Sequence, residues 1–125
     1  MTVGKALGRA LLSGMFIHGG YHAAKEPGGR VEMAEKIGIP SAELMVKVNG
    51  SLMVIAGILL ALGIRPRLAA LILAGCLIPT TYAGHQFWDQ ETKQASDQQL
   101  TQFMKNLAML GGLVVVLAEE RRSAA

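Results

Sequence analysis

The sequence predicts an all-α membrane protein, a single domain of 125 residues built as a bundle of four transmembrane helices. Two observations carry this prediction. Residues 52–63 and 68–83 are nearly uninterrupted apolar runs, and neither has a polar face when drawn as a helix. Such a helix is buried on every side or lies in lipid, and a domain this small exposes too much surface to bury two. The charged turn Arg65-Pro66-Arg67 between the runs is the second observation, and we interpret it as a hairpin loop at a membrane surface.

Four segments approach the roughly 20 residues that cross a hydrocarbon core ~30 Å thick. We place them at about residues 4–24, 42–64, 67–87 and 102–119. The first and fourth are short and carry polar residues, so they depend on burial against their neighbours. In the first loop, residues 31–37 have helical spacing with charged residues on one side, which predicts a short amphipathic helix at the membrane surface. The second loop, residues 88–101, is polar.

Composition excludes several other classes. The formal net charge is +3, with Lys and Arg concentrated at segment ends. Membrane topology explains this better than nucleic-acid binding, because no basic stripe with interleaved aromatic residues is present. Cys76 is the single cysteine, so the chain forms no internal disulfide. The sequence carries no nucleophile elbow, phosphate-binding glycine loop or dinucleotide fingerprint, and whether the chain is an enzyme is left open.

The distribution of basic residues predicts the orientation in a plasma (inner) membrane. One side carries six of them: Lys5, Arg9, Arg65, Arg67, Arg121 and Arg122. The other carries Lys25, Arg30, Lys36 and Lys93, diluted by acidic residues. The positive-inside bias therefore places both termini in the cytoplasm and the two long loops outside. Helix contacts are expected at small residues, namely Gly4, Gly8, Gly57, Gly63, Gly75, Gly111 and Gly112.

Polar residues in the predicted helices gather at one depth. At 1.5 Å per residue, all lie within roughly 10 Å of the outer ends of their helices. They are His18 and His22 in the first helix, Lys47 and Asn49 in the second, Thr80, Thr81, Tyr82 and His85 in the third, and Lys105 and Asn106 in the fourth. Ionisable groups in spanning segments usually face the bundle and mark functional sites. We therefore predict one outward-facing polar pocket, in which Lys47, His85, Lys105 and Asn106 converge.

Each residue of this layer also has a simpler interpretation. His18 and His22 share a helix face, which suits metal or haem ligation, but no cysteine or carboxylate joins them at a coordinating spacing, and we predict no metal site. Lys47 and Lys105 could extend to headgroups, and the two asparagines could be interhelical hydrogen bonds. The complete set suits a polar head group such as a quinone, whose carbonyl oxygens need the donors that Lys, His and Asn supply.

Several stretches resemble the DoxX family of small four-helix membrane proteins. They are Gly8-Arg9-Ala10-Leu11-Leu12-Ser13-Gly14-Met15-Phe16-Ile17, Val46-Lys47-Val48-Asn49-Gly50, the hairpin from Gly57 to Ala70, Gly84-His85-Gln86-Phe87-Trp88 and Phe103-Met104-Lys105-Asn106-Leu107. The resemblance covers essentially the whole chain outside the two loops. It favours Lys47, Asn49, His85, Trp88, Lys105 and Asn106 as site residues, and His18 and His22 less strongly.

The resemblance implies a membrane component of a bacterial redox or oxidative-stress system, because members of the family are described as such components. The family name derives from a thiosulfate–quinone oxidoreductase subunit. It gives two hypotheses. The first is a membrane subunit of an oxidoreductase complex that binds quinone in the polar pocket, with the lipid bilayer and redox proteins as partners. The second is a non-catalytic scaffold or assembly factor whose outer loops recruit a partner protein. A small-molecule carrier is disfavoured, because the inner half offers no polar path. Whether the chain forms a homo-oligomer is left open.

Overall fold

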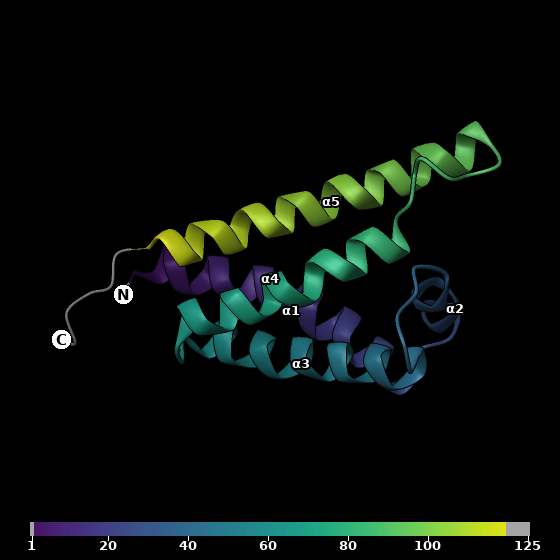
Figure 1. Cartoon of the computed structure of the whole chain (residues 1–125). Helices are drawn as coiled ribbons and strands as arrows, with labels where there is room; N and C mark the ends of the chain where they lie inside the picture. Colours follow the sequence, from purple (N-terminus) through teal and green to yellow (C-terminus); the bar gives the residue numbers. More distant parts are fainter. Residues whose placement is uncertain (1, 120–125) are drawn as a thin grey trace.

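The computed structural model describes residues 2–119, and these residues fold into five α-helices with no strand. The helices are α1 (Val3–Lys25), α2 (Gly29–Lys36), α3 (Ala42–Leu62), α4 (Pro66–Gly84) and α5 (Lys93–Ala118). Figure 1 shows α1, α3, α4 and α5 running lengthwise beside one another, with α2 at one end. We call this end the α2 end and the opposite one, where α3 turns into α4, the hairpin end. The all-helical prediction is confirmed.

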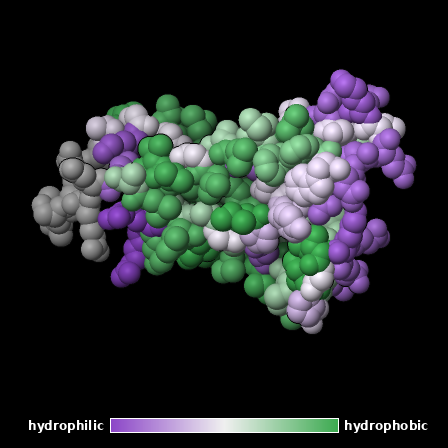
Figure 2. Space-filling model, turned by 45° about the horizontal axis from the view of Figure 1, so that its top comes forward, coloured by the Kyte–Doolittle hydropathy of each residue, from purple (hydrophilic) through white to green (hydrophobic). Residues whose placement is uncertain are grey.

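Three helices are long and apolar enough to cross a membrane: α3, α4 and α5. This chain is a membrane protein. The fourth predicted span, α1, has 23 residues and the necessary length. It carries Lys5, Arg9 and Lys25 as well as two histidines, however, and is not among the three apolar spans of the described residues. In Figure 2 hydrophobic residues cover the middle of the molecule and hydrophilic residues gather at its ends. This distribution matches a bilayer-embedded body with wetted ends.

Gly63 and Pro66 shift the turn between α3 and α4 relative to the prediction: α3 ends two residues earlier and α4 begins one residue earlier. Gly63 has a left-handed φ of 72°, and the Ile64 N–H bonds the Leu59 carbonyl at 2.9 Å, so α3 ends at Leu62 rather than at residue 64. Pro66 then begins α4, since its missing N–H costs nothing in a first helical turn. The charged turn lies where the sequence places it.

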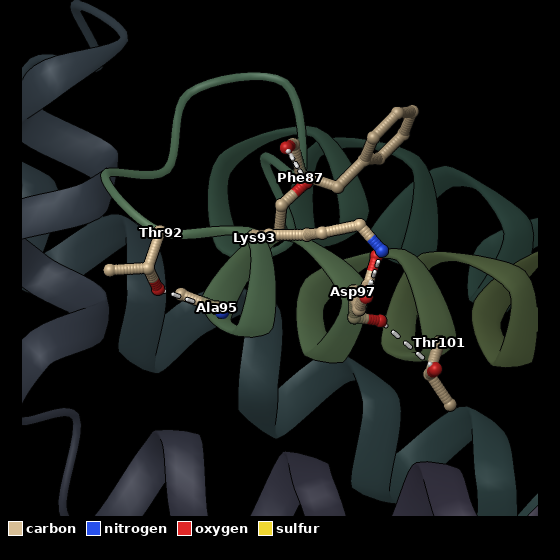
Figure 3. Close-up of polar contacts among 7 residues, drawn as sticks. Phe87, Thr92, Lys93, Ala95, Asp97 and Thr101 are labelled. Carbon is tan, nitrogen blue, oxygen red and sulfur yellow. Dashed lines mark hydrogen bonds and ion pairs between the residues drawn. The ribbon is translucent and has the colours of Figure 1, made fainter.

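Two helix boundaries at the α2 end differ more from the prediction. Helix α4 ends at Gly84 instead of residue 87. Helix α5 begins at Lys93 instead of residue 102, because the Thr92 hydroxyl accepts the Ala95 N–H at 3.1 Å and caps the helix (Figure 3). Residues 93–101 of the predicted polar loop 88–101 are therefore helical. The first turns of α5 extend past the end of α4 (Figure 1). They are therefore polar, and an apolar pattern in the sequence does not mark them as helix.

The short amphipathic helix in the first loop is confirmed as α2, which begins two residues before the predicted start. Ala34 is its buried contact, with 4% exposure. An ion pair of 2.7 Å between Lys36 and Asp89 joins α2 to the loop between α4 and α5. Both partners are exposed, so this pair contributes little stability, but it holds two surface segments together.

Helices α1 and α3 make the closest contact of the bundle, at glycines that the sequence analysis missed. A Cβ atom on Gly50 would lie 2.6 Å from the Gly20 carbonyl oxygen and 2.8 Å from the Ala24 nitrogen. Of the predicted contact glycines, Gly57 and Gly112 do meet neighbouring side chains. Within the chain, four others make no helix contact: the Cβ positions of Gly8, Gly75 and Gly111 are open, and that of Gly4 meets only its own cap residue.

We expect Gly50→Ala to lower the stability of the bundle by about 1–3 kcal/mol, because backbone atoms of α1 cannot move aside as a side chain would. Gly75→Ala is the matched control, since its Cβ position is open and alanine favours a helix by up to about 1 kcal/mol. Thermal unfolding in detergent measures both variants. Equal midpoints for the two would contradict the close packing of α1 on α3.

Cysteine labelling tests the orientation that the basic residues predict; Arg121 and Arg122, which contribute to it, lie outside the described residues. In a Cys76→Ala background, we expect an impermeant reagent to label Gln98→Cys in intact cells and to spare Ser123→Cys until the membrane is opened. The two single-cysteine variants differ only in the position of the thiol and are treated with the same reagent. Labelling of Ser123→Cys alone would reverse the orientation.

Candidate functional site

Two consecutive threonines of α4 hold the neighbouring helices at the α2 end. The Thr80 hydroxyl donates to the Cys76 carbonyl at 2.8 Å, and its oxygen accepts the side-chain amide of Asn49 in α3 at 2.9 Å. The same amide nitrogen lies 3.4 Å from the Cys76 carbonyl oxygen. Pro79 precedes these threonines and removes one backbone donor from this part of α4.

Thr81 makes the equivalent contact with α5. Its hydroxyl donates to the Leu77 carbonyl at 2.7 Å and accepts from the Asn106 amide at 2.9 Å. Both residues are buried, with exposures of 8% and 5%. The Asn106 amide has a second N–H and a carbonyl oxygen. Asn106 can therefore make further hydrogen bonds, as donor and as acceptor, besides the one to Thr81.

A groove of about 280 Å³ opens between α4 and α5 at this hydrogen bond. Its lining is otherwise almost entirely apolar. The lining residues are Leu77, Ile78, Thr81 and Tyr82 from α4, and Phe103, Asn106, Leu107 and Leu110 from α5. Ile78, Tyr82 and Leu107 are also among the exposed large hydrophobic residues, so the groove is open toward the bilayer.

Aromatic rings surround the α2 end of this groove. The Phe87 ring meets the rings of Trp88 and Phe103 edge-on, at centroid distances of 5.1 and 5.2 Å. The Trp88 ring lies 6.0 Å from that of Tyr82. Edge-to-face pairs at these distances are favourable. The predicted site residue Trp88 thus belongs to the wall above the groove and is not in its lining.

The first turns of α5 are tied back to the end of α4. The Ser96 hydroxyl donates to the Phe87 carbonyl at 2.7 Å (Figure 3). His85 Nδ1 lies 2.9 Å from the Gln99 side-chain oxygen, and because an amide oxygen only accepts, Nδ1 is the donor of this bond. Within the exposed turn, Lys93 pairs with Asp97 at 3.5 Å. His85 therefore contacts the start of α5 through Gln99 and is not in the lining of the groove.

The structure distributes the other predicted site residues away from the groove. Lys47 is exposed and pairs with Glu43 one turn earlier on α3, at 3.3 Å. His18 and His22 are exposed on α1, with ring centroids 4.7 Å apart. Lys105 is half-buried and lies one heptad before Gly112, the position that meets Leu12 of α1. All share the α2 end, but only Asn106 of the predicted set lines the groove.

Arg9 is a charged residue whose burial its sequence position does not indicate. It lies toward the hairpin end of α1, as expected, but it is 5% exposed and continues the buried face of α1 that includes Ser13. The Ser13 hydroxyl donates to the Arg9 carbonyl at 2.6 Å. Spacing gave the available signal, because Arg9, Ser13 and Phe16 recur at helical intervals on one face.

Comparison with known proteins identifies the family. A family model described as DoxX matches residues 4–86, about two thirds of the chain. The matched segment contains α1 to α4 and ends before Trp88, Lys105 and Asn106. No curated protein and no solved structure matches the chain.

We expect Thr81→Val to destabilise the bundle by about 1–2 kcal/mol, because it leaves the buried amide of Asn106 without its acceptor. Thr80→Val should cost less, since the half-buried Asn49 keeps the Cys76 carbonyl within reach. Thermal unfolding in one detergent compares them. The double variant Thr81→Val/Asn106→Leu should lose less stability than the sum of the two single variants. A loss equal to that sum would contradict a hydrogen bond between Thr81 and Asn106.

Proposed function

Since the chain belongs to the DoxX family, we propose that it is an integral membrane subunit of a plasma-membrane redox or oxidative-stress complex and that it binds a quinone between α4 and α5. One observation carries the proposal: an apolar groove, open to the bilayer, has the polar pair Asn106 and Thr81 in its wall. Most quinone carriers combine an apolar tail with a ring that bears carbonyl oxygens, and the groove offers a surface for each part.

The chemistry of the lining supports this ligand class. Leucine and isoleucine side chains match an isoprenoid tail, whose transfer from the bilayer costs little. The free N–H of the Asn106 amide can donate to a ring carbonyl. The rings of Tyr82 and Phe103 can stack on a quinone ring. Such a donor would stabilise negative charge that develops on the quinone oxygen upon reduction.

A scaffold function is the second candidate, favoured by the polar surface at the α2 end. The first turns of α5 project beyond α4 and carry exposed polar side chains, including Lys93, Asp97 and Thr101 (Figure 3). The exposed ion pair of Lys36 with Asp89 joins α2 to the loop beside this surface. A partner protein could recognise the combined surface without any ligand in the groove.

Binding of a decyl-chain benzoquinone to the purified protein distinguishes the two functions. We expect Asn106→Leu to weaken binding about fivefold, which corresponds to one neutral hydrogen bond of about 1 kcal/mol. Leu107→Trp should weaken it more, because the indole fills the groove. Val115→Trp is the matched control, since it adds the same side chain to an exposed position of α5 outside the lining. Equal quinone affinities for the wild type and the three variants would refute binding in the groove.

Lys105→Met measures how far the site extends. Because Lys105 lies on the side of α5 that carries Gly112, a ligand confined to the groove should bind this variant nearly normally. A tenfold or larger loss, the worth of a charged hydrogen bond of about 1.5–3 kcal/mol, would assign the site to the wider polar layer that the sequence predicts. If no variant affects the ligand while Asp89→Lys abolishes partner recruitment, the scaffold function is correct.

A further inference from the structure

Helix α1 presents a regular stripe of exposed residues. They follow one another at alternating intervals of four and three, the spacing of a helix-pairing seam. The stripe consists of Gly4, Gly8, Leu11, Met15, His18 and His22, and every one of them is exposed. No atom of the bundle lies within 4 Å of a Cβ built on Gly8, and Leu11 is 70% exposed. The α1 stripe is thus a complete seam without a partner in the chain.

The buried face of α1 lies on its other side. That face, which contains Arg9, Ser13, Phe16, Gly20 and Ala23, packs into the bundle. At roughly 100° per residue, the centre of the α1 stripe lies roughly 140° around the helix from the centre of the buried face. The bundle therefore cannot cover both faces at once.

The two histidines make lipid an unfavourable cover for this stripe. Polar ionisable side chains in spanning helices almost always face protein or water, because hydrocarbon offers their nitrogens no hydrogen-bond partner. Neither imidazole of His18 and His22 hydrogen-bonds to another of residues 2–119; their contacts are ring contacts with each other and with Tyr21. His18 lies seven residues, about 10 Å, before the end of α1 at Lys25, so in an α1 that crosses the bilayer it lies below the headgroup zone.

We propose that a second copy of this chain covers the α1 stripe, and that His18 and His22 of the two copies together form a site for a divalent transition metal. Copies in one membrane share an orientation, so a two-fold axis along the membrane normal pairs α1 with α1 in parallel. Each stripe residue then meets its own counterpart at the same depth. The glycines let the backbones approach closely at the hairpin end, and the histidines meet at the α2 end.

The ligand set fits the metal. Histidines four residues apart on one helix face can bind the same Zn²⁺ ion, as in helical zinc sites. One chain supplies only this pair, and residues 2–119 contain no group of three metal-binding side chains. A second copy raises the set to four imidazoles, the number a tetrahedral zinc site requires. The site is therefore incomplete without the partner copy.

Disulfide cross-linking tests the pairing of α1 with α1. In a Cys76→Ala background, Leu11→Cys and Met15→Cys should form disulfide-linked dimers in native membranes on mild oxidation, because both positions face the two-fold axis. Ala10→Cys is the matched control: it is exposed on the same helix at the same depth, but lies off the stripe. Equal cross-linking at positions 10, 11 and 15, or no cross-linking at positions 11 and 15, would overturn the proposed interface. These are the results expected if lipid or another protein covers this face of α1.

Zinc titration of the purified full-length protein tests the metal site. We expect zinc to raise the midpoint of thermal unfolding by several degrees and to increase the dimer fraction in native mass spectra, since four imidazoles of the paired state bind zinc more tightly than two. His18→Gln and His22→Gln should each abolish both responses, and their exposure means that folding should survive. His85→Gln, which changes the remaining histidine of the chain, should respond like the wild type. A zinc response that survives in both stripe variants, or that wild type lacks, would overturn the metal site.

Discussion

The hydrogen bonds of Thr80 and Thr81 set the relation of α4 to its two neighbours, and the candidate site depends on them. In an apolar bundle, packing alone constrains sliding and rotation of helices weakly, whereas each asparagine amide reaches one hydroxyl at one depth. Each threonine proton is donated to its own helix, so the oxygen is left to accept. This arrangement brings Asn106 to the wall of the α4–α5 groove.

The sequence predicts the helical architecture because hydropathy is a property of single segments. The apolar runs and the Arg65-Pro66-Arg67 turn give the hairpin. Asn49 and Asn106, which the depth pattern assigns to a ligand site, make the interhelical hydrogen bonds that were their simpler interpretation. Depth does not reveal direction, however. Lys105 adjoins Asn106 in sequence and yet lies on another side of α5. The groove forms between two helices, α4 and α5, and the hydropathy of either helix alone does not show which faces meet.

Helix α1 shows where hydropathy fails as a guide. Its average is lowered by Lys5, Arg9 and the two histidines, although Arg9 is buried and Gly20 is in backbone contact with α3. A helix that packs by glycine contacts needs little apolar surface to hold its place, so composition understates its integration into the bundle. Because one face of α1 is enough to hold it against the bundle, its opposite face, the α1 stripe, is left available to a second copy.

The groove and the α1 stripe occupy separate surfaces, and this separation makes the two proposals compatible. No stripe residue lines the groove, and the contact of α1 with α5 at Leu12 and Gly112 lies between them. A dimer joined through α1 would therefore leave the α4–α5 grooves open to lipid. That is the access a membrane-dissolved quinone needs, since its tail enters laterally from the bilayer and never crosses water. A dimer joined through α4 and α5 would instead close the groove, and it would leave four histidine side chains facing hydrocarbon.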